Sequence, residues 1–126
     1  MWKIGKRFSF DASHQLPGLP EGHKCARLHG HTYTVEVVLE AEKLVGPGFV
    51  SDFGDLEPFR RYLHEHFDHR HLNEVVGVEA PTSERLARGF ADWILENLTD
   101  GLAGNLAAVR VSETPNTWAE YFVVRR

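Results

Sequence analysis

The sequence predicts an α+β fold in which two helices cover one face of an antiparallel four-stranded sheet. Two observations predict it: apolar residues alternate with polar ones in four segments, and they recur at helical spacing in two segments between the strand pairs. The expected order is therefore β-β-α-α-β-β. The sequence has no internal repeat or low-complexity tract, so residues 1–126 are expected to form a single domain with a substantial core.

The first pair of expected strands flanks a loop. Apolar side chains alternate from Trp2 to Phe10, and His14 has the same parity, so it is expected to point toward the interior. Proline and glycine residues over positions 15–28 indicate a long loop, and such loops often carry binding groups. Alternation resumes at His31 and continues to Leu39, which places His31 at the start of the buried face of a second strand.

The middle of the chain carries two helical patterns. Asp55 is the expected N-cap of the first helix, with Pro58 in its first turn and an apolar stripe that ends at Phe67. Thr82 is the expected N-cap of the second helix, whose apolar face extends to Leu98. Both stripes are typical of core-facing helices.

The last pair of strands is expected on either side of a turn at Pro115 and Asn116. Ala107, Val109 and Val111 alternate with other residues in the third strand, and residues 118–124 form the fourth. Glu113 continues the apolar face of the third strand. It is either the exposed end of that strand or a binding group in a pocket, where its carboxylate needs hydrogen-bond donors; spacing alone leaves both interpretations open.

Composition narrows the functional class. The net charge is −4 and the pI is near 6.0, with no basic patch, so nucleic acid is not an expected partner. No apolar run reaches the roughly 18 residues of a membrane-spanning helix, and the N-terminus lacks the apolar segment of a signal peptide. A single cysteine is compatible with a reducing compartment. These features lead us to expect a cytoplasmic protein without a membrane partner.

The segment from Cys25 to His31 carries the strongest chemical signal. Cys25 precedes two histidines, His29 and His31, which share one face of an extended segment and are separated by a glycine. His14 adds a third imidazole, and three imidazoles with an open position are typical of a catalytic zinc site. The simpler alternative is that His29 and His31 are ordinary polar residues at a strand edge. The nearby cysteine and the third histidine favour the metal site.

Two further residues suggest proton-transfer chemistry. Asp68 and His69 place a carboxylate beside an imidazole, a combination that can orient a general acid or base. Because this dipeptide is common, solvated loop residues are the alternative interpretation. Cys25 is the natural candidate for a nucleophile or base, and its position in a loop argues against an inert buried thiol.

Together these residues resemble the 6-pyruvoyl-tetrahydropterin synthase family, most closely its bacterial branch of 6-carboxy-tetrahydropterin synthases. The resemblance rests on six segments: Phe10–His14, Glu21–His31, Val50–Leu56, Asp68–Asn73, Pro81–Glu84 and Ser112–Thr114. It implies a tunnelling (T-fold) barrel to which each subunit contributes a four-stranded sheet and two helices. Three subunits would close the barrel, and two trimers would stack as a homohexamer.

The resemblance also implies residue roles. His14, His29 and His31 are similar to the zinc ligands of the family, and Cys25 to its catalytic thiol. Asp68 and His69 are similar to its proton-relay pair, which a neighbouring subunit supplies. The remaining implied roles concern the substrate: Glu113 is similar to the residue that anchors the pterin ring, while Lys24 and Arg27 are candidates to contact a triphosphate.

The implied activity is that of a zinc-dependent lyase. It would convert 7,8-dihydroneopterin triphosphate to 6-carboxy-5,6,7,8-tetrahydropterin, with release of acetaldehyde and triphosphate, early in queuosine (7-deazapurine) biosynthesis. Leu28 disfavours one branch that makes a folate precursor, because that branch has glutamate at this position. The alternatives are an enzyme that stops at 6-pyruvoyl-tetrahydropterin, a non-catalytic zinc- or pterin-binding module, and a zinc hydrolase, which would want a carboxylate rather than a thiol near the metal.

Overall fold

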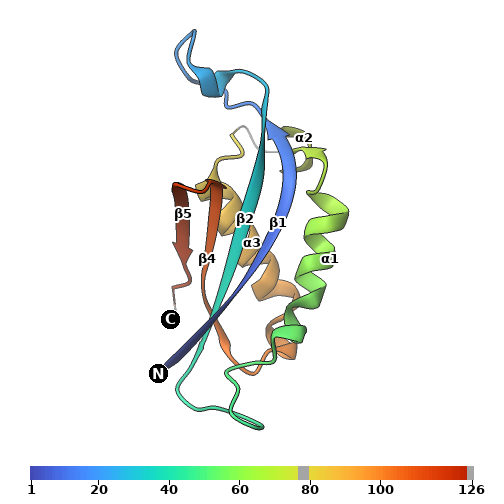
Figure 1. Ribbon diagram of the computed structural model, residues 1–126, viewed down its shortest axis with the longest axis vertical. Coiled ribbons are helices and arrows are strands. Elements are labelled where there is room, and N and C mark those ends of the chain that lie inside the picture. Colours follow the sequence, from blue (N-terminus) through green and yellow to red (C-terminus); the bar gives the residue numbers. More distant parts are fainter. Residues whose placement is uncertain (77–79, 125–126) are drawn as a thin grey trace.

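The computed structural model describes residues 1–76 and 80–124, in which five strands form one mixed sheet (Figure 1). The strands, in the spatial order β3-β1-β2-β4-β5, are β1 (Trp2–His14), β2 (His29–Ala41), β3 (Arg70–His71), β4 (Asn105–Thr114) and β5 (Thr117–Phe122). The helices are α1 (Glu57–His66), α2 (Leu72–Val76) and α3 (Ser83–Asn97). The four expected strands and two expected helices are present. The two-residue β3, which runs parallel to β1, and the short α2 are additions.

The long antiparallel pair of β1 and β2 is the backbone of the sheet. Its register runs from Trp2 opposite Ala41 to His14 opposite His29. Both strands extend further than alternation alone predicts, β1 past Phe10 and β2 back to His29, because the extra residues pair with each other. The loop between them, with a 3-10 turn at 24–26, projects past the end of the sheet (Figure 1).

The helices cover one face of the sheet, and aromatic side chains form the centre of the core. Phe10 and Tyr33 stack at 4.9 Å between ring centroids and 8° between ring planes. Phe90 of α3 meets Phe10 edge-on at 6.1 Å, and Phe59 of α1 meets Phe90 in the same way at 5.7 Å. These rings come from the apolar faces that alternation and helical spacing predicted, so both patterns are confirmed.

The two helix starts differ in how well the sequence predicts them. Thr82 caps α3 as expected, because its side chain accepts a hydrogen bond from the backbone N–H of Arg85 at 3.2 Å. Asp55 as the cap of α1 is wrong. Asp52 instead accepts from the N–H of Gly54 at 2.9 Å and starts a 3-10 turn over 53–56, which contains Asp55 and leads directly into α1.

Within residues 1–76 and 80–124, both edges of the sheet are open. β3 pairs with β1 only at Ala12 and Ser13, and β5 forms the other edge. The sheet therefore does not close on itself, and unpaired edges are the places where further strands can add. Within the described residues, no helix combines the length and apolar character that crossing a bilayer requires.

The turn before β4 packs closely against the loop at residues 50–51. Gly104 is buried, and its N–H donates to the Ser51 hydroxyl at 2.7 Å. A Cβ at this position would lie 2.7 Å from Val50 Cγ1. We expect Gly104→Ala to lower the free energy of unfolding by about 1–3 kcal/mol, because the backbone or Val50 must shift. Urea unfolding at fixed protein concentration measures this.

Gly101→Ala is the matched control, since a Cβ at Gly101 would meet no atom within 4 Å. It should leave the unfolding midpoint nearly unchanged. Equal midpoints for the Gly104→Ala variant and the unsubstituted protein would contradict the packing argument.

Candidate functional site

Three histidines gather where β1 ends and β2 begins. The candidate ligand nitrogens of His14, His29 and His31 lie within 4.8 Å of one another. Antiparallel pairing sets His14 opposite His29, and the two-residue repeat of a strand puts His31 on the same face. The intervening Gly30 carries no side chain between them.

Hydrogen bonds fix how two of these imidazoles are oriented. Nδ1 of His29 donates to the carbonyl of Arg27 at 2.6 Å, and Nδ1 of His14 lies 3.3 Å from the carbonyl of Pro81. In that tautomer each Nε2 carries a free lone pair, and the two Nε2 atoms face each other at 2.8 Å. Two facing lone pairs are stabilised when a cation lies between them, and carbonyl-bound Nδ1 groups are the usual outer partners of metal-binding histidines.

The surroundings of the histidines favour the neutral form that binds metals. Burial lowers the pKa of His14, which is fully enclosed, and also the pKa of His31. The nearby Glu113 carboxylate opposes part of this effect. Nε2 of His31 is buried and has no hydrogen-bond partner among the described residues; Glu113 lies 3.7 Å away. The chemistry of this donor set and its unpartnered nitrogen fit a bound metal ion.

The Cys25 thiol is not a member of this group of ligands. Cys25 is half-buried in the 3-10 turn, its N–H donating to Nδ1 of His23 at 3.0 Å. Among the described residues, neither group able to hold a metal includes the Cys25 thiol. Lys24 and Arg27 are exposed on the same loop.

Asp68 and His69 are fixed against β1 by the backbone of Asp11. The N–H of Asp11 donates to the Asp68 carboxylate at 2.9 Å, and the carbonyl of Asp11 accepts from the N–H of His69 at 2.6 Å. The first of these bonds lowers the pKa of Asp68. Nδ1 of His69 lies 3.1 Å from the Asp68 carboxylate, and His69 has a left-handed backbone with φ of 58°. The pair is therefore oriented, with the imidazole exposed.

Two hollows meet beside His31. One, of about 560 Å³, is lined by His31, His69 and strand residues near Ala12. The other, of about 820 Å³, contains Glu113 and Trp118 as well as His31. One chain thus brings the three histidines together with Glu113, and it places His69 on the wall of an adjoining hollow.

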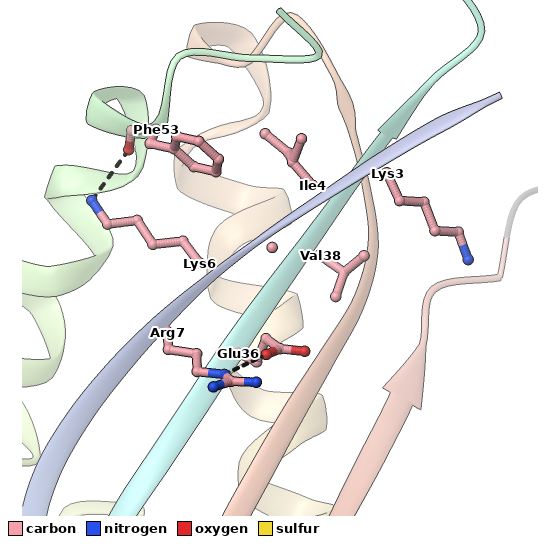
Figure 2. A pocket seen from close by; sticks show the side chains of 8 residues that line it. Lys3, Ile4, Lys6, Arg7, Glu36, Val38 and Phe53 are labelled. Carbon is pink, nitrogen blue, oxygen red and sulfur yellow. Dashed lines mark hydrogen bonds and ion pairs between the residues drawn. The ribbon is translucent and has the colours of Figure 1, made fainter.

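A third hollow, at the N-terminal half of β1, does not have the character of a site (Figure 2). Lys3 and Lys6 extend away from each other, and Lys6 donates to the carbonyl of Phe53 at 3.5 Å. Arg7 is paired with Glu36 at 2.8 Å. No set of polar groups in this hollow converges on one point.

Sequence reasoning missed three residues around the site. The Tyr33 hydroxyl lies 2.9 Å from Nδ1 of His14, a contact that the shared parity of Tyr33 and His31 could have suggested. The contacts of Asp11 with Asp68 and His69, and of Trp118 with Arg110, gave no signal, because they depend on pairing between separate segments.

Comparison with known proteins identifies relatives of this chain by sequence. A sequence profile of the family described as 6-pyruvoyl tetrahydropterin synthase matches residues 3–123. A 6-carboxy-5,6,7,8-tetrahydropterin synthase from Synechocystis is 41% identical over 130 residues, covering 99% of this chain and 96% of its own. A dihydroneopterin monophosphate aldolase from Pyrococcus furiosus is 35% identical over 110 residues, covering 87% of this chain and 86% of its own.

The fold has relatives among solved structures. The 6-pyruvoyl tetrahydropterin synthase of Caenorhabditis elegans superposes with a TM-score of 0.82 at 24% identity, covering 98% of this chain and 96% of that one. The expected T-fold subunit is thereby confirmed. With a profile match over nearly its whole length and a relative at 41% identity, the chain belongs to the 6-pyruvoyl tetrahydropterin synthase family.

Proposed function

We propose that this chain is a zinc-dependent lyase that converts 7,8-dihydroneopterin triphosphate to 6-carboxy-5,6,7,8-tetrahydropterin, with release of acetaldehyde and triphosphate. The observation that carries the proposal is the three-histidine group beside Glu113, in a chain 41% identical to a 6-carboxy-5,6,7,8-tetrahydropterin synthase. The product would serve queuosine or another 7-deazapurine in the cytoplasm. Residues 1–126 would act as one catalytic domain.

His14, His29 and His31 would hold the zinc ion. When bound, zinc supplies a Lewis acid that polarises oxygen atoms of the substrate side chain and favours removal of their protons or of neighbouring ones. Cys25 stands outside the ligand group, so its sulfur would be available to take a proton from the substrate. His69, oriented by Asp68, would exchange a proton at the other face of the side chain.

Glu113 would anchor the pterin ring. Its carboxylate lies at the end of β4 in the hollow that also contains His31. A pterin presents an amino group and a ring N–H side by side, which match the two acceptor oxygens of one carboxylate, and charge-assisted pairs of this kind are strong. Lys24 and Arg27, both exposed on the Cys25 loop, would contact the triphosphate.

A product assay tests the proposed reaction. The protein incubated with 7,8-dihydroneopterin triphosphate should release acetaldehyde and 6-carboxy-tetrahydropterin, measured by trapping of the aldehyde and chromatography of the pterin. Cys25→Ala should retain zinc and lose nearly all turnover, because the proton acceptor is gone.

Products other than 6-carboxy-tetrahydropterin would identify the alternative activities. A 6-pyruvoyl product assigns the synthase activity of the family name, and cleavage of the monophosphate but not the triphosphate assigns the aldolase activity of the Pyrococcus relative. Pterin binding without turnover leaves a binding module.

Metal analysis tests the ligand set. We expect about one zinc ion per chain, and loss of zinc in His31→Ala because two imidazoles no longer suffice for a tight site. His66→Ala is the control, since His66 is exposed on α1 and its ring lies against Tyr62. Equal zinc content in the two variants, measured by atomic emission after gel filtration, would exclude the proposed ligands.

We also propose a homohexamer, a dimer of trimers, in which the open edges of the sheet pair with neighbouring chains and subunits share each site. The unpaired edges of β1 and β5 support this assembly. Inactive Cys25→Ala and inactive His69→Ala chains should then regain partial activity when mixed under conditions of verified subunit exchange. Failure to regain activity would place both groups in one chain; light scattering separately measures the assembly size.

A further inference from the structure

The loop that carries Cys25 leaves the sheet at Gln15, directly after the end of β1. The short helix α2 lies beside this point, where the loop projects past the sheet (Figure 1). β3, which directly precedes α2, pairs in parallel with Ala12 and Ser13 of β1. Contacts that continue this pairing therefore fall at the base of the loop.

The side-chain amide of Asn73, on α2, continues the pairing beyond the last residue of β1. Its Oδ1 accepts a hydrogen bond from the N–H of Gln15 at 2.9 Å, and its Nδ2 donates to the carbonyl of Gln15 at 2.7 Å. One side chain thus binds both backbone groups of one residue, as a neighbouring strand would bind them. Asn73 is half-buried, and the adjacent Leu72 is fully enclosed in the core, so the amide has a packed support.

Gln15 and its neighbour Leu16 in turn hold the 3-10 turn that contains Cys25. The N–H of Leu16 donates to the carbonyl of Cys25 at 3.0 Å, and Nε2 of Gln15 donates to the carbonyl of Ala26 at 3.4 Å. These two bonds join the turn to the end of β1. A continuous series of backbone and side-chain contacts therefore connects the amide of Asn73 to the backbone of Cys25.

The other candidate groups are anchored at different points. Asp68 and His69 are bonded to the backbone of Asp11, and the three histidines of the candidate metal site lie on the paired strands β1 and β2. Loss of the Asn73 amide is therefore expected to displace Cys25 rather than these groups.

We propose that Asn73 is a positioning residue for the Cys25 thiol and acts through Gln15 and Leu16. The catalytic part of this inference rests on the proposed function, because it takes Cys25 as the residue that accepts a proton from the substrate. A displacement of a reacting group by about 1 Å can lower a rate about a hundredfold. A thiol on a projecting loop depends on attachments of this kind for such precision.

Alkylation of the thiol tests the attachment without substrate. Cys25 is the only cysteine of the chain, so loss of free thiol during reaction with iodoacetamide reports on this position alone. Asn73→Leu preserves the approximate size of the side chain but removes both hydrogen bonds to Gln15. The half-buried thiol should then react about fivefold to fiftyfold faster, because the bonds that oppose local opening of the loop are lost.

Asn97→Leu is the matched control for the alkylation rate. The amide of Asn97 also donates to a backbone carbonyl, that of Trp93 at 2.9 Å, but it lies at the end of α3. Its removal should leave the alkylation rate of Cys25 unchanged.

Steady-state kinetics measures the catalytic consequence. Asn73→Leu should lower kcat about tenfold to a hundredfold and change KM by less than about twofold, because Glu113 and the metal ligands keep their supports. Zinc content should equal that of the unsubstituted protein, and light scattering checks the assembly. Asn73→Asp keeps the acceptor for the N–H of Gln15 and loses only the donor, so it should change both rates in the same directions by smaller factors.

The outcomes separate this inference from the proposed function. Equal alkylation rates of Asn73→Leu and the unsubstituted protein, or faster alkylation with an unchanged kcat, overturn the positioning role and leave the lyase proposal standing. Absence of turnover in the unsubstituted protein overturns the lyase proposal, while the alkylation rates still decide whether Asn73 holds the Cys25 loop. If Asn73→Leu fails to assemble, Asn73→Asp decides by the same two measurements.

Discussion

The register between β1 and β2 is the constraint on which the rest of the structure depends. It sets His14 opposite His29 at the end of a long antiparallel pair, and His31 lies two residues further on the same face. A slip of one residue would turn one strand's histidines to the opposite face of the sheet. The core enforces the register four residues away, because Phe10 stacks on its strand partner Tyr33. Packing of aromatic rings therefore aligns the imidazoles.

The sequence was informative wherever a period exists. Alternation identified the four long strands, and it assigned His14 to the buried face before any pairing was known. Helical spacing identified α1 and α3, and Thr82 marked the start of α3. It failed at α1 because Asp52 and Asp55 both precede the same apolar stripe, and a 3-10 turn between them has too few residues to show a period. The two residues of β3 are likewise too few for alternation.

The residues of the candidate site likewise divide into those that a periodic pattern predicts and those that it does not. The three-histidine group was accessible from spacing because strand geometry converts spacing into direction. The contact of Asp11 with Asp68 and His69, and the support of Trp118 by Arg110, join segments far apart in the chain or depend on a hairpin register. Position 25 lies in a loop without periodicity. The sequence therefore shows that the thiol is close to the histidines along the chain, but it does not determine their distance in space. The roles of these residues remain predictions.

The residues of the candidate site differ in how deeply they are buried. His14 is enclosed, and its neighbour Tyr33 belongs to the aromatic core, so the candidate metal site is supported directly by core packing. Nε2 of His31 has no hydrogen-bond partner among the described residues, and a buried polar atom of this kind destabilises the fold by about 1–3 kcal/mol. An ion bound there would relieve that cost and stabilise the folded chain by linkage.

The other candidate groups are less buried: Cys25 lies on a projecting loop, and His69 lies next to the short β3. The β3 edge, beside His69, is a place at which another chain can pair. The geometry thus separates a candidate metal site, formed by intrachain strand pairing, from the projecting Cys25 loop and the sheet edge beside His69, which a neighbouring subunit can reach.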